Sequence, residues 1–255
     1  MADINNSVFS VNIDPKSNNL VISGGQDDKA YVWSATNGEV LLNCTGHKDS
    51  VTCVGFSHDG MYAATADLSG LIKVWKVETK KEIWSFEASD VETFQGHGCT
   101  AGVGRIMPDG NDAHKSSIIC LDCYNDNNIM ITGSTDVTAK IINTNTGKVL
   151  STFDCKDKNS QEENSVETVG FCKVQNLAAT GTLLGSLCIW DVPTQTVRNV
   201  CHHETGIVKL KWDNTSPLVY TACLDGIVRL WDARNSELIS SWSGHLDSIL
   251  DFNIS

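Results

Sequence analysis

Short apolar segments separated by turn residues repeat along the chain. Residues 51–56 are apolar and partly alternating, and a His-Asp-Gly turn follows them at 58–60. Three similar segments come next, at 62–65, 71–75 and 82–86. Strand-length segments with turn signals at intervals of about 8–12 residues predict an all-β fold. Because no segment shows a sustained 3.6-residue apolar period, we expect units of four short strands and almost no helix.

Two phrases recur in register and give the chain its period. The first begins with Gly-His or a substitute and continues as an apolar strand, at 46–60, 114–126, 164–176, 203–215 and 244–255, with an initial copy at 5–17. The second follows about 17–25 residues later, and two of its copies end in the complete Trp-Asp pair, at Trp190-Asp191 and Trp231-Asp232. The Gly-His pair, the period of about 42 residues and the Trp-Asp ending resemble the WD40 repeat family. The resemblance implies an all-β propeller of four-stranded blades around a central channel.

The spacing predicts that residues 1–255 form a single domain, which contains five complete blades and two partial repeats. The complete repeats are predicted at about 4–46, 47–90, 114–161, 162–202 and 203–244, and the partial repeats at 91–113 and 245–255. Between the second and third complete repeats, about 59 residues of the regular pattern are missing. A parent with eight repeats accounts for every fragment. We therefore interpret the chain as a shortened form, and the spacing leaves open whether its ring closes.

Charge narrows the range of partners. The chain has 31 acidic and 19 Lys or Arg residues, with a formal net charge of −12. It lacks the positive field that drives phosphate binding, so we expect no direct contact with nucleic acid. A basic, Lys- or Arg-rich protein partner suits this balance. The alternative is that the acidity only keeps the protein soluble.

Composition also sets expectations about compartment. Hydrophobic residues make up 41% and charged residues 20%, the balance of an ordinary globular protein. No apolar run reaches the length of a transmembrane helix, and the start MADINNSVFS lacks the pattern of a secretory signal. The ten cysteines are scattered singly, which favours free buried thiols in a reducing compartment over disulfides. We expect a cytoplasmic protein, with nuclear or peripheral plasma-membrane locations also open.

His, Ser, Asp and Trp recur together, which admits two interpretations. A hydrolase triad is needed once, whereas this set repeats imperfectly from unit to unit. The family resemblance implies instead a structural hydrogen-bond network within each blade, where buried polar groups satisfy one another. The predicted network residues are His47, Trp75, His114, Ser134, Asp136, His203, Asp225 and Trp231. Two departures stand out: Asp67 and Ser69 look interchanged in the second repeat, and Ile142 replaces Trp in the third.

Other candidate chemistry is weak. Cys120 and Cys123 have a metal-like spacing, but residues three apart on a strand point to opposite faces. The run Cys201-His202-His203 lacks a second ligand pair in the sequence, and the glycine-rich stretch at 96–104 lacks the pattern of a phosphate loop. We therefore predict no catalytic residue, no metal and no cofactor, and a protein that is not an enzyme.

The predicted binding surface is acidic. Residues 154–165 form a connector that is longer than its counterparts, and it carries several carboxylates. If the strand assignments hold, this connector lies at the same propeller face as the turns between second and third strands. The predicted partner-binding residues are Asp27, Asp28, Asp49, Glu162, Glu163, Glu204 and Asp247. The alternative is a solvated loop without a partner.

Several stretches match one eight-repeat member of the family closely. They include residues 46–59, 69–75, 164–172 and 225–234. That resemblance implies a non-enzymatic protein-interaction scaffold in cell migration and angiogenesis-type signalling, with peripheral membrane or cytoskeletal contact left open. A related fungal protein implies an alternative, a chaperone or assembly factor for a basic protein of the large ribosomal subunit.

Overall fold

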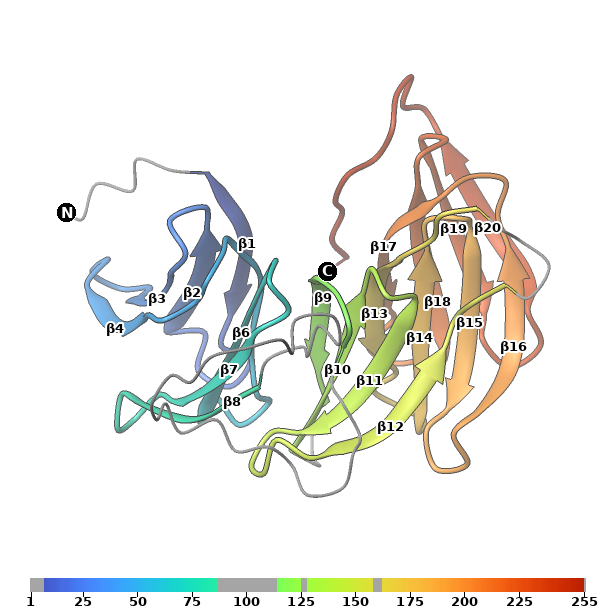
Figure 1. The fold of residues 1–255 in the computed structure, drawn as a ribbon. Helices are drawn as coiled ribbons and strands as arrows, with labels where there is room; N and C mark the ends of the chain where they lie inside the picture. Colours follow the sequence, from blue (N-terminus) through green and yellow to red (C-terminus); the bar gives the residue numbers. More distant parts are fainter. Residues whose placement is uncertain (1–6, 87–113, 125–127, 158–161, 255) are drawn as a thin grey trace. The chain divides into compact units, whose positions relative to one another are not determined.

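The computed structural model describes residues 7–86, 114–124, 128–157 and 162–254, which form twenty strands and no helix (Figure 1). The strands make five antiparallel sheets, and each sheet consists of four strands that follow one another in the chain. Consecutive strands therefore pair as hairpins, the arrangement that short turns allow. The predicted all-β fold of four-stranded units is confirmed, and the sheets are called blades 1 to 5 below. The predicted partial repeat at 91–113 lies outside the described residues.

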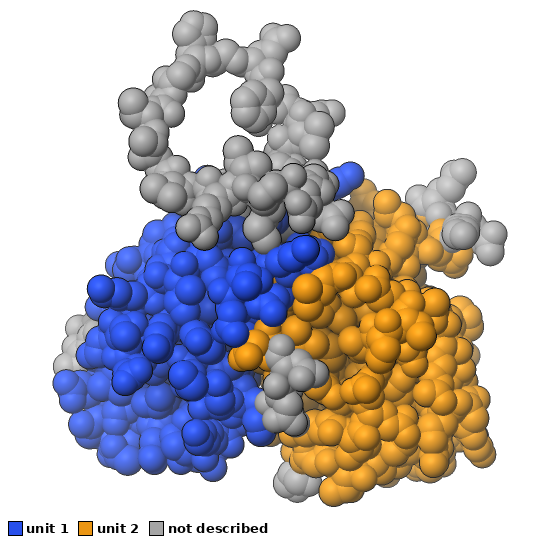
Figure 2. Space-filling model, turned by 90° about the horizontal axis from the view of Figure 1, so that it is seen from below, with its two compact units in different colours: residues 1–118, 143–149 blue, residues 119–142, 150–255 orange. Residues whose placement is uncertain are grey.

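The chain divides into two compact units, coloured separately in Figure 2. Unit 1 comprises residues 1–118 and 143–149 and contains blades 1 and 2. Blade 1 is formed by β1 (Val8–Ile13), β2 (Leu20–Gly25), β3 (Ala30–Ser34) and β4 (Val40–Cys44). Blade 2 is formed by β5 (Val51–Phe56), β6 (Tyr62–Asp67), β7 (Ile72–Lys76) and β8 (Lys81–Phe86).

Unit 2 comprises residues 119–142 and 150–255 and contains the other blades, except that Ile118 and the β11–β12 turn belong to unit 1. Blade 3 is formed by β9 (Ile118–Cys123), β10 (Ile129–Ser134), β11 (Thr138–Asn143) and β12 (Val149–Asp154). Blade 4 is formed by β13 (Val166–Phe171), β14 (Leu177–Thr182), β15 (Ser186–Asp191) and β16 (Thr196–His202). Blade 5 is formed by β17 (Ile207–Trp212), β18 (Leu218–Cys223), β19 (Ile227–Asp232) and β20 (Glu237–Ser243).

A shift in strand register recurs directly before the tryptophan of the third strand. It falls between Val32 and Trp33, Val74 and Trp75, Ile189 and Trp190, and Leu230 and Trp231. An irregularity of this kind inserts a residue on one strand and redirects the side chains beside it. The Trp of blades 1, 2, 4 and 5 is thereby presented from the same place in each sheet.

Within each unit, the first strand of one blade packs on the second strand of the blade before it. The second strand of blade 1 has glycine at the contact, and a Cβ on Gly24 would lie 2.7 Å from Val51 Cγ1 and 2.8 Å from Val54 Cγ1. In unit 2, a Cβ on Gly181 would lie 2.8 Å from Ile207 Cγ2. These distances are too short for a side chain, so glycine lets successive blades approach closely.

The C-terminal segment corrects one expectation. The partial repeat at 245–255 predicts the first strand of a further unit, but residues 248–254 belong to none of the five sheets. The segment is nevertheless fixed at one point, because the side chain of Ile249 is only 7% exposed. It has no described second strand to pair with, so its backbone forms no ladder.

Candidate functional site: the blade network and the connector end

A hydroxyl group on the second strand accepts a hydrogen bond from the tryptophan indole in four blades. The bonded pairs are Trp33 Nε1 to Ser23 Oγ at 2.8 Å, Trp75 Nε1 to Thr65 Oγ1 at 3.1 Å, Trp190 Nε1 to Thr180 Oγ1 at 3.0 Å and Trp231 Nε1 to Thr221 Oγ1 at 3.3 Å. Sequence reasoning missed these hydroxyl residues. The signal was present, because the fourth residue of every second strand is Ser or Thr, including Thr132 in blade 3.

In blade 2 the network is extended by a buried histidine. His47 Nε2 lies 2.7 Å from Thr65 Oγ1, and His47 Nδ1 lies 2.9 Å from Asp67 Oδ2. Both side chains of the His47–Asp67 pair are 0% exposed. Ser69, in the turn after β6, donates its hydroxyl to Asp67 Oδ1 at 2.6 Å. The interchange of Asp67 and Ser69 therefore keeps the network, since the carboxylate reaches His47 directly from the strand.

Asp67 accepts several hydrogen bonds at once. Besides the two side chains, its carboxylate accepts the backbone N–H groups of Lys48, Ser69 and Leu71. Burial acts to raise the pKa of Asp67, but the hydrogen bonds from His47, Ser69 and the backbone outweigh it and hold the pKa below its ordinary value. The carboxylate thus ties the connector before β5 to the β6–β7 turn.

Blade 5 contains a second histidine in a different hydrogen-bond arrangement. His203 Nδ1 faces the carbonyl of Gly185 at 3.1 Å, so it carries the hydrogen and donates. Its Nε2 then accepts from Thr221 Oγ1 at 2.9 Å and from Trp231 Nε1 at 3.1 Å. The structure places Asp225 beside Arg229, at 2.7 Å, and not within a hydrogen bond of His203. Burial, and after it the Arg229 guanidinium, lowers the pKa of His203 to about 4.

The low pKa of His203 predicts a pH dependence of stability. The unfolded chain binds a proton at this histidine near pH 6.5, whereas the folded chain binds it only near pH 4, so stability should fall as the pH drops through this window. The expected loss is on the order of 2 kcal/mol, allowing for partial solvent screening. His203→Gln keeps an acceptor but cannot titrate, so urea unfolding between pH 4 and 6.5 should show a flatter slope. His202 is exposed, so His202→Gln is the control and should leave the slope of stability against pH unchanged. An unchanged slope in His203→Gln would contradict the low pKa of His203.

Of the remaining network residues, Ser134 and Asp136 lie in blade 3, and His114 precedes its first strand. His114 and Ser134 are fully buried, and Asp136 accepts from Thr138 Oγ1 at 2.6 Å while its own N–H donates to Ser134 Oγ. Ile142, where the other blades have Trp, is 1% exposed and lies in the core. Here apolar packing takes the place of the indole hydrogen bond.

The loops at one end of the blades form a continuous surface in unit 2. The N–H of Leu183 donates to Ser165 O and that of Leu224 to Gly206 O, both at 3.0 Å, so each β-turn between second and third strands lies against the start of its own blade. His203 N donates to Gly185 O at 2.8 Å, which joins the β14–β15 turn to the β16–β17 connector. We call this surface, formed by residues 162–165, 183–185, 203–206, 224–226 and 245–248, the connector end.

Four of the predicted partner-binding residues lie on the connector end and are exposed. They are Glu162, Glu163, Glu204 and Asp247. Three of them are adjacent to a residue that holds the surface together. Glu163 precedes Asn164, whose Oδ1 accepts the N–H of Leu184, Glu204 follows His203, whose N–H donates to Gly185 O, and Asp247 precedes Ser248, whose Oγ donates to Leu224 O at 3.0 Å. The carboxylates are interleaved with Leu183 and Leu224, whose side chains are 41% and 37% exposed. The surface is therefore acidic with apolar positions between the charges.

The other three predicted residues belong to unit 1. Asp28 and Asp49 are exposed, whereas Asp27 is half-buried and accepts a hydrogen bond from Tyr31 OH at 2.8 Å. Asp27 and Asp28 occupy the β2–β3 turn, and Asp49 precedes Val51, which packs on Gly24 at the end of β2. These three residues therefore share the equivalent end of blades 1 and 2.

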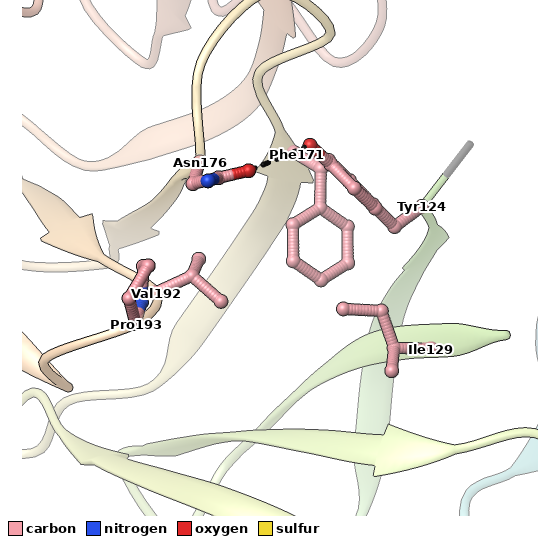
Figure 3. A pocket seen from close by; sticks show the side chains of 6 residues that line it. All are labelled: Tyr124, Ile129, Phe171, Asn176, Val192 and Pro193. Carbon is pink, nitrogen blue, oxygen red and sulfur yellow. Dashed lines mark hydrogen bonds between the residues drawn. The ribbon is translucent and has the colours of Figure 1, made fainter. Parts of the chain in front are cut away.

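A small cavity lies elsewhere in unit 2. It has a volume of about 150 Å³ and is lined by Tyr124, Ile129, Phe171, Asn176, Val192 and Pro193 (Figure 3). Its polar lining groups satisfy each other, because Tyr124 OH donates to Asn176 Oδ1 at 3.3 Å. The lining is otherwise apolar and contains no nucleophile beside a base.

The described residues contain neither a cluster of metal ligands nor a membrane-spanning helix. In residues 7–86, 114–124, 128–157 and 162–254, no group of three or more His, Cys, Asp or Glu side chains is placed to hold a metal ion. Over the same ranges, no helix has the length and apolar character needed to span a membrane. No two of the nine cysteines of the described residues form a disulfide with each other, and seven of the nine are buried.

Comparison with known proteins agrees with the repeated four-stranded sheets. The family model for the WD domain, G-beta repeat, matches residues 4–34, 38–76 and 194–232. The chain is 42% identical over 317 residues to angio-associated migratory cell protein of Homo sapiens, covering 98% of this chain and 73% of the relative. It is 25% identical over 316 residues to an uncharacterized WD repeat-containing protein of Schizosaccharomyces pombe, covering 96% of this chain and 78% of that protein. The chain is also 24% identical over 246 residues to the ribosome biogenesis protein WDR12 homolog of Drosophila mojavensis. This match covers 92% of this chain and 55% of that protein.

The chain belongs to the WD40 repeat family, which indicates a non-catalytic scaffold that binds protein partners. Within the family it is similar to angio-associated migratory cell protein. The matched stretch of 317 residues is longer than the 255 residues of this chain, so the human relative has residues in that stretch that this chain lacks. This agrees with the shortened form indicated by the repeat spacing.

Proposed function

We propose that this chain is a protein-interaction scaffold whose connector end binds a basic segment of a partner protein. The observation that carries the proposal is the row of exposed carboxylates on a surface fixed by backbone hydrogen bonds. Glu162, Glu163, Glu204 and Asp247 are exposed, and the last three are next to residues that are bonded to the turns of blades 4 and 5. A preorganised surface loses little conformational entropy when it binds, which favours specific association.

The surface chemistry defines the partner segment. Lys or Arg side chains pair with the carboxylates, and apolar side chains between them contact Leu183 and Leu224. Complementary charge of this kind raises the association rate and makes binding sensitive to salt. The formal net charge of −12 extends the attraction beyond the contact itself.

Two cellular roles fit such a scaffold. The similarity to angio-associated migratory cell protein supports a role in cell migration and angiogenesis-type signalling, in the cytoplasm or at the periphery of the plasma membrane. The acidic connector end supports a second candidate, an assembly factor that shields a basic ribosomal protein, and one relative is named for ribosome biogenesis. Affinity capture from cells followed by mass spectrometry distinguishes them, because it identifies either signalling partners or a ribosomal protein.

Charge reversal tests the binding surface. Changing Glu162, Glu163, Glu204 and Asp247 to Lys replaces attraction with repulsion, so affinity for a Lys/Arg-rich peptide should fall at least tenfold, about 1.4 kcal/mol or more. Titration calorimetry at two salt concentrations measures both the affinity and its salt dependence. Reversing Glu162 and Glu163 alone shows the contribution of the connector before β13.

The matched control reverses acids away from the connector end. Glu78 lies in the β7–β8 turn and Glu237 starts β20, and both are exposed. Changing these two residues to Lys alters the net charge but leaves the connector end intact, so affinity should change little. If the control weakens binding as much as reversal of Glu162 and Glu163, net charge alone drives association and the proposed site is wrong.

A further inference from the structure

Blade 4 departs from blades 2 and 5 at the centre of its hydrogen-bond network. In blades 2 and 5, a histidine contacts the hydroxyl group of a second-strand threonine that lies 18 residues further along the chain. The corresponding residue of blade 4 is Glu162, which is exposed. Cys155 contacts the hydroxyl instead, and its Sγ lies 3.4 Å from Thr180 Oγ1. In blade 4, a thiol therefore occupies the place of the histidine ring.

A second thiol lies beside the same hydroxyl. Cys188 of β15 is the direct cross-strand partner of Thr180 and is hydrogen-bonded to its side chain. Side chains at directly paired positions of antiparallel strands have Cβ atoms about 4.5–5.5 Å apart. In the other four blades, the third-strand residue at this position is long and polar: Tyr31, Lys73, Lys140 and Arg229. Blade 4 alone among the five described blades thus places two sulfur atoms around one hydroxyl.

The surroundings of the two thiols are enclosed and partly apolar. Cys155 is 6% exposed and Cys188 is 8% exposed. Trp190 Nε1 donates to Thr180 Oγ1 at 3.0 Å, so the hydrogen of the hydroxyl group is available to a sulfur atom. The ring of Phe153 stacks on the Trp190 indole with the centroids 4.4 Å apart. Burial raises the pKa of Cys155 to about 12 and that of Cys188 to about 11, so neither thiol is a reactive nucleophile at neutral pH.

We propose that Cys155 and Cys188 are the two ligands of a binding site for a soft monovalent cation, Cu(I). Thiolate sulfur is the type of ligand that selects Cu(I), and two sulfur atoms satisfy this ion. A structural Zn(II) ion is almost always bound by four ligands, so the pair is too small for zinc. Cys155 follows β12 and Cys188 lies on β15, so the ion joins the connector after blade 3 to the third strand of blade 4.

Binding exchanges protons for copper without a redox step. Two S–H bonds break, two Cu–S bonds form, both protons pass to solvent, and copper remains Cu(I). The complex carries one negative charge, and a buried charge needs hydrogen-bond donors. The Thr180 hydroxyl supplies one donor, and the backbone N–H of Ala139 supplies another to Cys155. The network of blade 4 therefore stabilises the two thiolates.

Anaerobic titration of the reduced full chain with Cu(I), in competition with bathocuproine disulfonate, tests this proposal. Native mass spectrometry should show one copper ion retained per chain, and tryptophan fluorescence should fall because Trp190 lies beside the Thr180 hydroxyl. Cys155→Ser or Cys188→Ser should weaken binding by more than about a hundredfold, since loss of an outer partner of a metal ligand already costs about 10–100-fold.

The matched control removes two buried thiols from other places. Cys44 in blade 1 and Cys172 in blade 4 are both 0% exposed, and the double variant Cys44→Ser/Cys172→Ser should bind Cu(I) as the unchanged chain does. Circular dichroism verifies that each variant is folded. Failure of the unchanged chain to retain copper, or equal loss of copper in the control, would overturn the proposal.

Two measurements on the unchanged chain test the site without any substitution. An ion that binds the folded chain raises the Tm, whereas an ion bound by scattered thiols of the unfolded chain lowers it. Cu(I) should therefore raise the Tm, and Zn(II) should leave it unchanged. X-ray absorption at the copper edge should show two sulfur ligands. An unchanged or lower Tm with Cu(I), or a copper ion with three or four sulfur ligands, would contradict the two-thiol site.

Discussion

Replacing Asp67 with alanine should lower the free energy of unfolding by about 3–5 kcal/mol, because it leaves His47 and several backbone N–H groups buried without their acceptor. Both side chains of the His47–Asp67 pair are 0% exposed, so water cannot take the place of the lost carboxylate. The measurement is urea unfolding followed by tryptophan fluorescence. Leu68→Ala, at the next residue and 37% exposed, is the control and should change stability by no more than about 0.5 kcal/mol.

The pH dependence of the Asp67→Ala effect provides an independent check. The folded-state pKa of Asp67 lies below the ordinary value of 3.8, so its contribution is fully present above that pH. It is lost as the pH falls through the folded-state pKa. The difference between wild type and variant should therefore be constant at neutral pH and shrink in strong acid. A difference that does not shrink would mean that Asp67 acts only by filling space.

Replacing Gly185 with alanine should destabilise the chain by about 3 kcal/mol and weaken binding at the connector end. Gly185 has a φ of +83°, and a Cβ there would lie 2.6 Å from His203 O and 2.7 Å from Thr205 O. Two costs in folding free energy add here. One is the strain of alanine in the left-handed region, and the other is the displacement of the two backbone oxygens by the new Cβ. Because the β14–β15 turn holds the connector that carries Glu204, the displacement moves a proposed binding residue.

Gly38 offers a matched control for this substitution. It has a φ of +70°, but nothing lies within 4 Å of the Cβ position. Gly38→Ala therefore reports the conformational strain alone, about 1–2 kcal/mol, and should leave peptide binding unchanged. Equal losses of stability in the two variants would show that the contacts of Gly185 with His203 and Thr205 carry no weight.

The repeat period by itself predicts most of the fold. Strand-length segments and the recurring Gly-His and Trp-Asp pairs were enough to predict four-stranded units. Side-chain alternation and turn residues are local properties of the sequence. The same pattern indicated the interchange of Asp67 and Ser69. Among the described residues, periodicity failed near the C-terminus, where residues 248–254 have the sequence of a first strand but join no sheet.

The functional surface was only partly readable from the sequence. The acidic residues of the connectors were visible as charges, but their neighbours Leu183 and Leu224 were not recognised as exposed, since an apolar residue in a turn does not reveal its exposure. The hydroxyl that accepts from each tryptophan was also missed, although Ser23, Thr65, Thr180 and Thr221 occupy one register position. One repeat alone does not indicate this role for Ser or Thr. The shared position becomes clear when the second strands of all five blades are aligned.

The sequence by itself determined the all-β class, the repeat length and the family, because these follow from local patterns that recur along the chain. Only the tertiary structure decided which equivalent residues are buried. Val8 and Val51 have the same position in their repeats, yet one is 46% exposed and the other 0%. The physical reason is that burial of a first strand depends on a preceding blade, and such a contact joins residues far apart in the sequence.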